Sequence, residues 1–355
     1  MTRSAAINEP PPPGPAEPEF VVQRVGEHLL LAAAQRLVSQ GLKDRVGAAR
    51  RLIQSAPQHG IDLSCIWVTV ARSEVGKRNC AVRQACLAIP GSGRTAMIFI
   101  SEPMPLALGG EPGGNQGATS ERMALLKAVT DHFAAVSKPD VRVLQALPEP
   151  TDAWAEAAFR GAGFTWVGDL EYRRRTIAPA EHQPSAKVVW PEGIRVVSVA
   201  DLQPSQRDST LLSVLDQSYA DTKDCPELCG MRSTGDILAS HFATGVFDPS
   251  LWFVVFSRKG NEETPCGCML LSRVPEQRAL ELVYVGLAPS VRKLGLGVRL
   301  MQHAIWCAAD PRIDAITCAV DCRNEPALRL YNQFAFSALG RRRAFVCSVP
   351  RAGGS

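Results

Sequence analysis

The chain has 355 residues, of which 46% are apolar and 21% are charged, and its formal net charge is +4. Such a composition is typical of a folded globular protein, and the small charge does not indicate a nucleic-acid partner. No apolar run reaches the roughly 18 residues that a membrane helix needs. The proline-rich segment at 1–19 lacks the apolar stretch of a signal peptide. We therefore expect a cytoplasmic protein, without a membrane or nucleic-acid partner, that begins with a disordered tail at 1–19.

The chain has eleven cysteines, but no two of them form a C-x-x-C pair. Zinc sites usually bring their ligands in such closely spaced pairs, so the sequence gives no support for a metal. Without an export signal, free thiols are the expectation.

In the first half of the chain, a short glycine turn precedes the segments with a clear apolar period. Residues 91–96 read GSGRTA and separate two apolar runs, which is typical of a hairpin. The apolar periods then predict alternating helices and strands at 121–136, 141–147, 152–164 and 165–177. A stretch rich in proline and alanine at 178–192 lacks a period and is the predicted linker.

The second half alternates between strand-like and helix-like stretches. Strands are predicted at 194–199, 251–258, 266–274, 279–287, 315–320 and 337–348, and helices at 207–219, 235–243, 298–309 and 326–334. The order predicts a mixed α/β fold, in which a mostly antiparallel sheet contains a parallel crossover after 287.

The two halves end with similar sequences, each predicted to form a helix followed by a strand. AEAAFRGAGF at 155–164 aligns with ALRLYNQFAF at 327–336, so that Phe159 stands opposite Tyr331, and a strand with three consecutive arginines follows in each half. The same succession of elements favours an internal duplication. The predicted domains are therefore 20–177 and 193–350.

A glycine loop, LAPSVRKLGLGVRL at 287–300, precedes the helix at 298–309. It lacks the lysine and hydroxyl of a Walker A loop. Leu300 stands where a dinucleotide-binding turn needs a small residue. The loop still opens a helix, so Gly295 and Gly297 let its free amides approach an anion, to which Arg292 or Lys293 adds charge.

Two signatures in this half resemble those of the GNAT superfamily of acyl-CoA-dependent N-acyltransferases. Leu287-Ala288-Pro289 with Arg292-x-x-Gly295-x-Gly297 is similar to the family's V-x-P and [QR]-x-x-G-x-[GA]. NEPALRLY at 324–331 is similar to N-x-x-A-x-x-L-Y, and Ala335-Phe336 departs from the usual Gly-Phe. The clear match covers 279–336, and the element order extends it to 193–350.

The resemblance implies two GNAT-like domains in tandem, of which the second is catalytic. In the first half, the glycine-rich segment at 101–121 is acidic and lacks the basic R-x-x-G-x-G pattern, and Phe159 replaces the tyrosine. We therefore interpret 20–177 as a degenerate GNAT-like domain.

The resemblance also implies residue roles. The acyl group passes directly from acetyl-CoA to a primary amine, with Tyr331 protonating the leaving thiolate and Glu281 accepting a proton from the amine. Asn324 caps the last helix and bonds the cofactor, and Tyr284 is expected on the opposite strand face from Glu281. The cofactor-binding positions are Val285 and Leu287, through their backbone, and Arg292, Lys293, Leu294, Gly295, Leu296, Gly297 and Val298.

The acceptor is expected to be a small-molecule or peptide amine. Tyr219, Asp221 and Asp224 lie where the family closes over its acceptor. They are interpreted either as residues that recognise a cationic substrate or as part of a solvated loop. The alternative function is a catalytically inactive CoA-binding or regulatory GNAT-fold protein. The duplication makes a monomer plausible.

Overall fold

The computed structural model describes residues 18–77, 80–104, 116–182 and 187–350. The predicted tail at 1–19 lies almost wholly outside these ranges, as do parts of the linker at 178–192 and of the glycine-rich segment at 101–121. The chain divides into two compact units, one of residues 1–87 and 100–125 and the other of residues 88–99 and 126–355. In the described part of the chain, no helix has both the length and the apolar character needed to cross a bilayer.

The smaller unit is built on antiparallel strands. β1 (Phe20–Arg24) pairs with β2 (Ile66–Ala71), which pairs with the start of β3 (Gln84–Gly91). The helices α1 (Glu27–Leu37) and α2 (Arg45–Ser55) lie between β1 and β2 in the chain. Glu121, at 2% exposure, accepts a hydrogen bond from Thr69 Oγ1 at 2.5 Å and pairs with Arg83 at 2.6 Å. A buried carboxylate therefore fastens the helix that carries it to β2.

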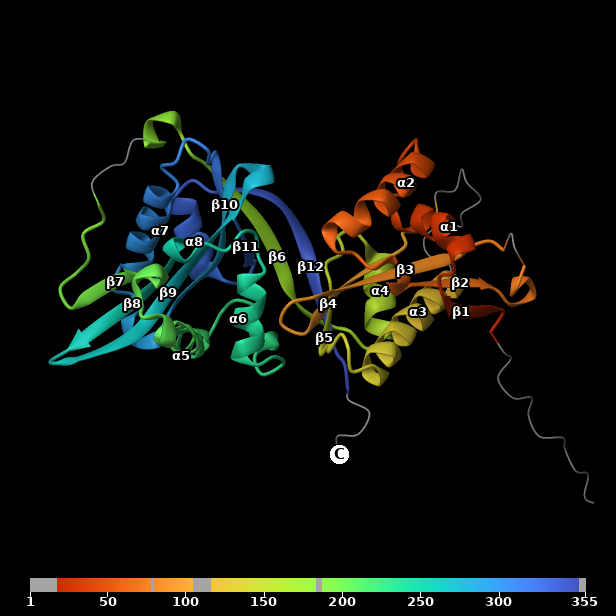
Figure 1. Cartoon of the computed structure of the whole chain (residues 1–355), viewed down its shortest axis with the longest axis horizontal. Helices are drawn as coiled ribbons and strands as arrows, with labels where there is room; N and C mark the ends of the chain where they lie inside the picture. Colours follow the sequence, from red (N-terminus) through yellow and green to blue (C-terminus); the bar gives the residue numbers. More distant parts are fainter. Residues whose placement is uncertain (1–17, 78–79, 105–115, 183–186, 351–355) are drawn as a thin grey trace, which may run out of the picture. The chain divides into compact units, whose positions relative to one another are not determined.

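The larger unit contains the strand order β4-β5-β12-β6-β11-β10-β9-β8-β7 (Figure 1). Two neighbouring pairs, β4 with β5 and β10 with β11, are parallel, and the others for which a register is determined are antiparallel. This confirms the predicted fold class. The elements are β4 (Thr95–Ile100), α3 (Gln116–Ala135), β5 (Val143–Ala146), α4 (Ala153–Gly161), β6 (Thr165–Thr176), β7 (Ile194–Ser198), α5 (Arg207–Tyr219), α6 (Thr234–Phe242), β8 (Trp252–Lys259), β9 (Glu262–Val274), β10 (Ala279–Leu287), α7 (Leu296–Cys307), β11 (Ala315–Asp321), α8 (Glu325–Gln333) and β12 (Ser337–Ser348).

The last strand of each predicted half pairs with strands of the other half. β12 lies between β5 and β6, and β6 lies between β12 and β11. Each half also has a parallel strand pair with a helix between its strands in the chain, α3 in the first and α7 in the second. Strands from both predicted halves therefore lie next to one another in the sheet.

Alternating side chains on β8 to β11 supply two separate cores. One core contains Met269 and Leu271 with Leu300 of α7 and Tyr331 of α8. The other contains Cys268 and Leu270 together with residues of α5 and α6. A strand points successive side chains to opposite faces, so α7 and α8 cover one face of these strands and α5 and α6 cover the other.

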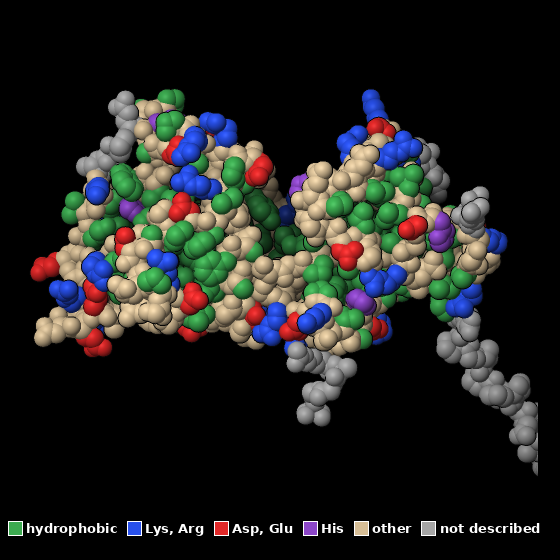
Figure 2. All heavy atoms as spheres, viewed as in Figure 1, with side chains coloured by type: hydrophobic (Ala, Val, Ile, Leu, Met, Phe, Trp, Pro, Cys, Tyr) green, Lys and Arg blue, Asp and Glu red, His purple; other side chains and the backbone are tan. Residues whose placement is uncertain are grey.

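Most arginines in the runs of β6 and β12 are paired with acids. Glu171 of β6 binds Arg173 at 2.6 Å and Arg341 at 2.8 Å. Arg342 binds Glu149 at 3.1 Å, and Arg343 pairs with Glu156. Basic and acidic side chains also lie among one another on the face drawn in Figure 2. The positive charges of these four arginines are thus balanced by acidic side chains of the protein, and no external anion is needed to explain them.

Candidate active site

The strands β10 and β11 separate part of the way along their length. Their parallel pairing joins Ala279–Glu281 to Ala315–Thr317, whereas β10 stays paired with β9 as far as Leu287. From Leu282 onward, the edge of β10 toward β11 therefore has no strand partner in the determined register. Its backbone N–H and C=O groups are available to a ligand, as in an edge strand.

The glycine loop leads from this strand end into α7. Lys293 has φ +65° and Gly295 has φ +75°, so two left-handed residues alternate with right-handed or extended ones just before the helix. Successive amides in such a path turn inward and form a nest for an anion. Gly295 caps α7 without a side-chain hydrogen bond, so the first amides of α7 also face outward.

A cavity of about 660 Å³ lies where these features meet. It brings together the strand edge of β10, the glycine loop, α8 and the segment after α5. Of the site residues expected from the sequence, those that line it are Val285, Leu287, Arg292, Lys293, Gly295, Leu296, Gly297, Val298, Asn324 and Tyr331.

Two expected residues lie elsewhere. Leu294 does not line the cavity and its side chain is 60% exposed. Glu281 lies at the closed end of the β10–β11 pair, where Thr317 Oγ1 donates a hydrogen bond to its Oε2. Burial raises the pKa of Glu281, and the Thr317 hydrogen bond opposes the rise.

The expectation for Tyr284 is wrong. The register of β10 against β9 shifts between Leu282 and Tyr284, so Val283 is an extra residue in a β-bulge. Glu281 pairs with Ser272 and Tyr284 pairs with Leu270, and two such alternate positions of β9 share one face. Glu281 and Tyr284 therefore face the same side of the sheet. The bulge also lays the Tyr284 ring against Gly286, whose missing Cβ leaves the space that the ring fills.

Arg292 is held by backbone carbonyls. Its guanidinium donates to Leu287 O at 2.9 Å and Ser218 O at 3.2 Å, and to the carbonyl oxygens of Ala220 and Asp221. These contacts join the glycine loop to the end of α5, whose last carbonyls lack intrahelical partners. The guanidinium of Arg292 is thus engaged by carbonyl oxygens of the protein itself.

Tyr331 and Asn324 belong to α8. Asn324 caps the helix, with its Oδ1 accepting from Ala327 N at 3.3 Å. Tyr331 is 4% exposed and its ring packs on Phe336 at 5.2 Å between centroids. Burial raises the pKa of Tyr331 well above its ordinary value, so the phenol stays protonated at neutral pH.

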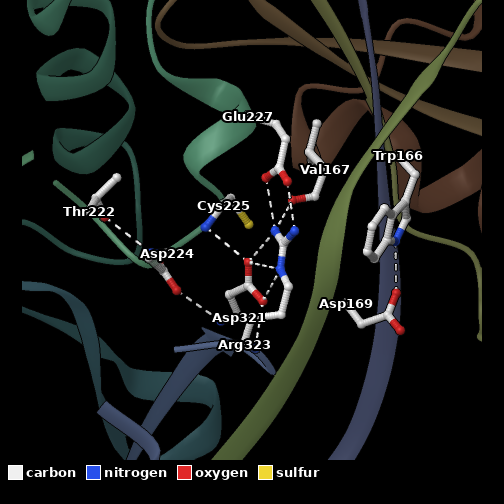
Figure 3. A network of polar contacts seen from close by, with 9 residues as sticks. All are labelled: Trp166, Val167, Asp169, Thr222, Asp224, Cys225, Glu227, Asp321 and Arg323. Atoms are coloured by element: carbon white, nitrogen blue, oxygen red, sulfur yellow. Dashed lines mark hydrogen bonds and ion pairs between the residues drawn. The ribbon is translucent and has the colours of Figure 1, made fainter. Parts of the chain in front are cut away.

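The segment after α5 is fixed by a polar network that the sequence did not predict (Figure 3). Asp321, fully buried at the end of β11, accepts from Cys225 N at 3.0 Å and from Arg323 Nη2 at 2.7 Å. Arg323 also binds Glu227 at 2.6 Å and donates to Val167 O at 2.7 Å. The only signal in the sequence was the position of both residues directly before the NEPALRLY signature.

Comparison with known proteins agrees with this geometry. Residues 219–336 match the model of the acetyltransferase (GNAT) family. The chain contains a GNAT acetyltransferase domain. The matched segment runs from the end of α5 to Phe336, and so includes β10, the glycine loop, α7, β11 and α8.

Two solved structures, those of a bacterial and a fungal protein, have a similar fold. A GCN5-related N-acetyltransferase from Sphaerobacter thermophilus has a TM-score of 0.56 at 15% identity, with 95% of this chain and 98% of that chain covered. A GCN5-related glucosamine N-acetyltransferase region of a fungal multi-domain β-N-acetylglucosaminidase has a TM-score of 0.50 at 12% identity, covering 94% of this chain and 38% of that chain. A tandem GNAT protein from the clavulanic acid biosynthesis pathway has a TM-score of 0.46 at 14% identity, covering 95% and 99%. No curated protein matches the chain significantly.

Proposed function

We propose that this protein is an N-acetyltransferase that uses acetyl-CoA and acetylates a primary amine in the cavity of its GNAT domain. The observation that carries the proposal is the meeting of the open β10 edge, the left-handed glycine loop and Tyr331 around one cavity. Each of these features suits a different part of an acyl-CoA molecule.

The pyrophosphate would lie at the start of α7. The inward amides of the loop from Lys293 to Gly297 and the positive end of the helix dipole both favour an anion there. Lys293 adds a positive charge beside them. The pantetheine arm would then run along β10, where its amides pair with the backbone at Val285 and Leu287.

The reaction proposed is direct transfer. The amine nitrogen forms a bond to the thioester carbonyl carbon, the C–S bond breaks, and its electron pair leaves on sulfur. Tyr331 gives a proton to that sulfur and recovers one from the nitrogen. A protonated phenol suits this task because it still carries its proton at neutral pH. The departing thiolate takes up a proton there, since the pKa of its thiol is about 8.5.

Isothermal calorimetry with acetyl-CoA tests the cofactor site. We expect wild-type protein to bind and Gly295→Val to bind at least about 10-fold more weakly, because a β-branched residue disfavours φ +75° and redirects the loop amides. Gly260→Val is the matched control. Gly260 also has a positive φ of +62° and open space around it, but it lies in the β8–β9 turn and not in the cavity lining. Equal affinity in the two variants contradicts the assignment of the loop.

Release of free CoA thiol in the presence of amines separates this function from its alternative. Acetyl-CoA binding with thiol release supports an acetyltransferase. Binding without release for any amine supports the inactive CoA-binding or regulatory protein instead.

A further inference from the structure

Asp224 is a carboxylate that lines the cavity from the segment between α5 and α6. Its Oδ1 accepts a hydrogen bond from Asp321 N at 2.8 Å, which holds the side chain at the end of β11 (Figure 3). Its own amide donates to Thr222 Oγ1 at 3.1 Å. The carboxylate thus has a fixed position at the point where β10 and β11 have separated.

The backbone on either side of Asp224 is constrained. Asp221 has φ +53° and Cys225 has φ +44°, conformations that cost energy in residues other than glycine. Contacts from Asp321 to Cys225 N and from Arg323 to Glu227 hold the segment in this form. The strained turn places both Asp224 and the neighbouring Lys223 in the cavity lining, and both residues are exposed.

Asp224 also lies close to Tyr331, the proposed acid. Burial is the main cause of the raised pKa of Tyr331, and the charge of Asp224 adds to it. The two arginines near the carboxylate are engaged elsewhere, since Arg292 donates to carbonyls and Arg323 binds Asp321 and Glu227, whereas Lys223 and Lys293 also line the cavity. Among the described residues, Asp224 itself has no ion-pair partner. A cation entering the cavity would therefore meet a carboxylate that forms no ion pair with the described residues.

Glu281 differs from Asp224 in its position. It lies outside the cavity lining, where β10 and β11 are still paired, and it is bonded to Thr317. The position expected from the sequence for the proton acceptor is therefore not part of the cavity lining, whereas Asp224 is.

We propose that Asp224 binds the ammonium group of the acceptor and takes up its proton, so that the substrate is a cationic primary amine. This inference rests on the proposed function. The ammonium gives one proton to the Asp224 carboxylate, and the freed lone pair of the nitrogen attacks the thioester carbonyl carbon. As the C–S bond breaks, the second nitrogen proton reaches sulfur through Tyr331, and Asp224 releases its proton to the solvent. The products are the N-acetyl amide, the CoA thiol and one proton.

The environment of Asp224 fits a proton acceptor. Desolvation in the cavity raises the pKa of its carboxyl and the charge of Asp321 adds to the rise, while the hydrogen bonds from Asp321 N and Asn324 and the charge of Arg323 oppose it. A more basic carboxylate removes a proton from an ammonium more readily.

The test compares Asp224→Asn with wild type in thiol release from acetyl-CoA, using two kinds of nucleophile. The cationic probes are tyramine, spermidine, glucosamine and Nα-acetyl-lysine, and the neutral probe is hydroxylamine, which is uncharged at neutral pH. Asparagine keeps an oxygen to accept from Asp321 N, so the segment should keep its shape. We expect wild type to acetylate at least one cationic probe. In Asp224→Asn, kcat/KM for that probe falls at least about 100-fold, the size of a lost general base, while hydroxylamine changes by less than about 3-fold.

Asp208→Asn is the matched control, because Asp208 is an exposed carboxylate in the first turn of α5 and does not line the cavity. It should leave both activities unchanged. Equal losses with both nucleophiles, or full activity of Asp224→Asn with the cationic probe, overturns the inference. So does a wild type that binds acetyl-CoA and acetylates hydroxylamine but no cationic probe. Failure of wild type to bind acetyl-CoA in calorimetry is a different result, and overturns the proposed function itself.

Discussion

Tyr331 shows how one side chain can serve both the core and the cavity. Its ring is buried among the residues between α7, α8 and the sheet, and it packs on Phe336. The same residue lines the cavity, and its hydroxyl interacts with the Cys318 thiol. Removal of the hydroxyl alone therefore separates the chemical role of Tyr331 from its packing role.

We expect Tyr331→Phe to lower kcat for CoA release about 100-fold, since the variant loses the proton donor for the thiolate. Its acetyl-CoA affinity should stay within about 3-fold, and its free energy of unfolding within about 1.5 kcal/mol, because the ring remains and one hydrogen bond contributes little. Steady-state kinetics, calorimetry and urea unfolding measure the three quantities. Tyr172→Phe is the control, as Tyr172 is a partly buried tyrosine of β6 outside the cavity lining. An unchanged kcat in Tyr331→Phe would remove this tyrosine from the chemistry.

At the scale of elements, the turn between β3 and β4 is fastened to α6. Arg94 binds Asp236 at 2.6 Å, and Ser240 Oγ donates to Ser92 O at 3.0 Å. Gly93 has φ +69°, and a Cβ on it would collide with Asp236 O and with the side chains of Arg232 and Ser240. The GSGRTA turn thus needs glycine for a contact with a distant helix as well as for its own conformation.

Gly93→Ala should lower the free energy of unfolding by about 2 kcal/mol or more, because it combines a strained φ with overlap against a backbone carbonyl. Gly91→Ala is the matched control. A Cβ there meets Thr95 Oγ1 at an ordinary 3.7 Å, so its effect should stay within about 0.5 kcal/mol. Urea unfolding followed by tryptophan fluorescence gives both values. Similar values for the two variants would show that the contact with α6 adds nothing to stability.

The elements of the second half follow directly from local pattern. The predicted limits of α5, β10 and β12 agree with Arg207–Tyr219, Ala279–Leu287 and Ser337–Ser348, because each has a clear apolar period and a turn at its end. The segment around Asp224 could not be predicted in this way. Its conformation depends on Asp321 and Arg323, almost a hundred residues away in the chain. The bulge at Val283 was missed for a similar reason, since one extra residue inside a regular strand leaves no mark in the apolar pattern.

At the scale of the molecule, the pairing of β6 and β12 makes the two predicted halves depend on each other. Local pattern identifies a strand but does not say which strand it pairs with, so the duplication led to the expectation of a separate domain at 193–350. Among the strands that the structure describes, the neighbours of β12 are β5 and β6, and both of these come from the first half. Phe345, fully buried in β12, packs against Phe159 of α4 at 5.6 Å between ring centroids.

Separation of the halves tests this dependence. A protease site inserted in the linker at 187–192 allows the chain to be cut and its pieces, 1–186 and 187–355, to be studied together or apart. We expect the isolated 187–355 piece to show no cooperative urea transition and no acetyl-CoA binding, because β12 loses both strand partners and β11 loses β6.

The cut but unseparated protein is the control, and it should keep the acetyl-CoA affinity of the intact chain, since every strand pair of the sheet is still present. Remixing the separated pieces should restore that affinity if pairing of β6 with β12 is what the isolated piece lacks. A 187–355 piece that unfolds cooperatively and binds acetyl-CoA alone would contradict this account. It would show that β7 to β11 with α7 and α8 hold the cavity without β6, and that the second half is an independent domain as the sequence pattern predicts.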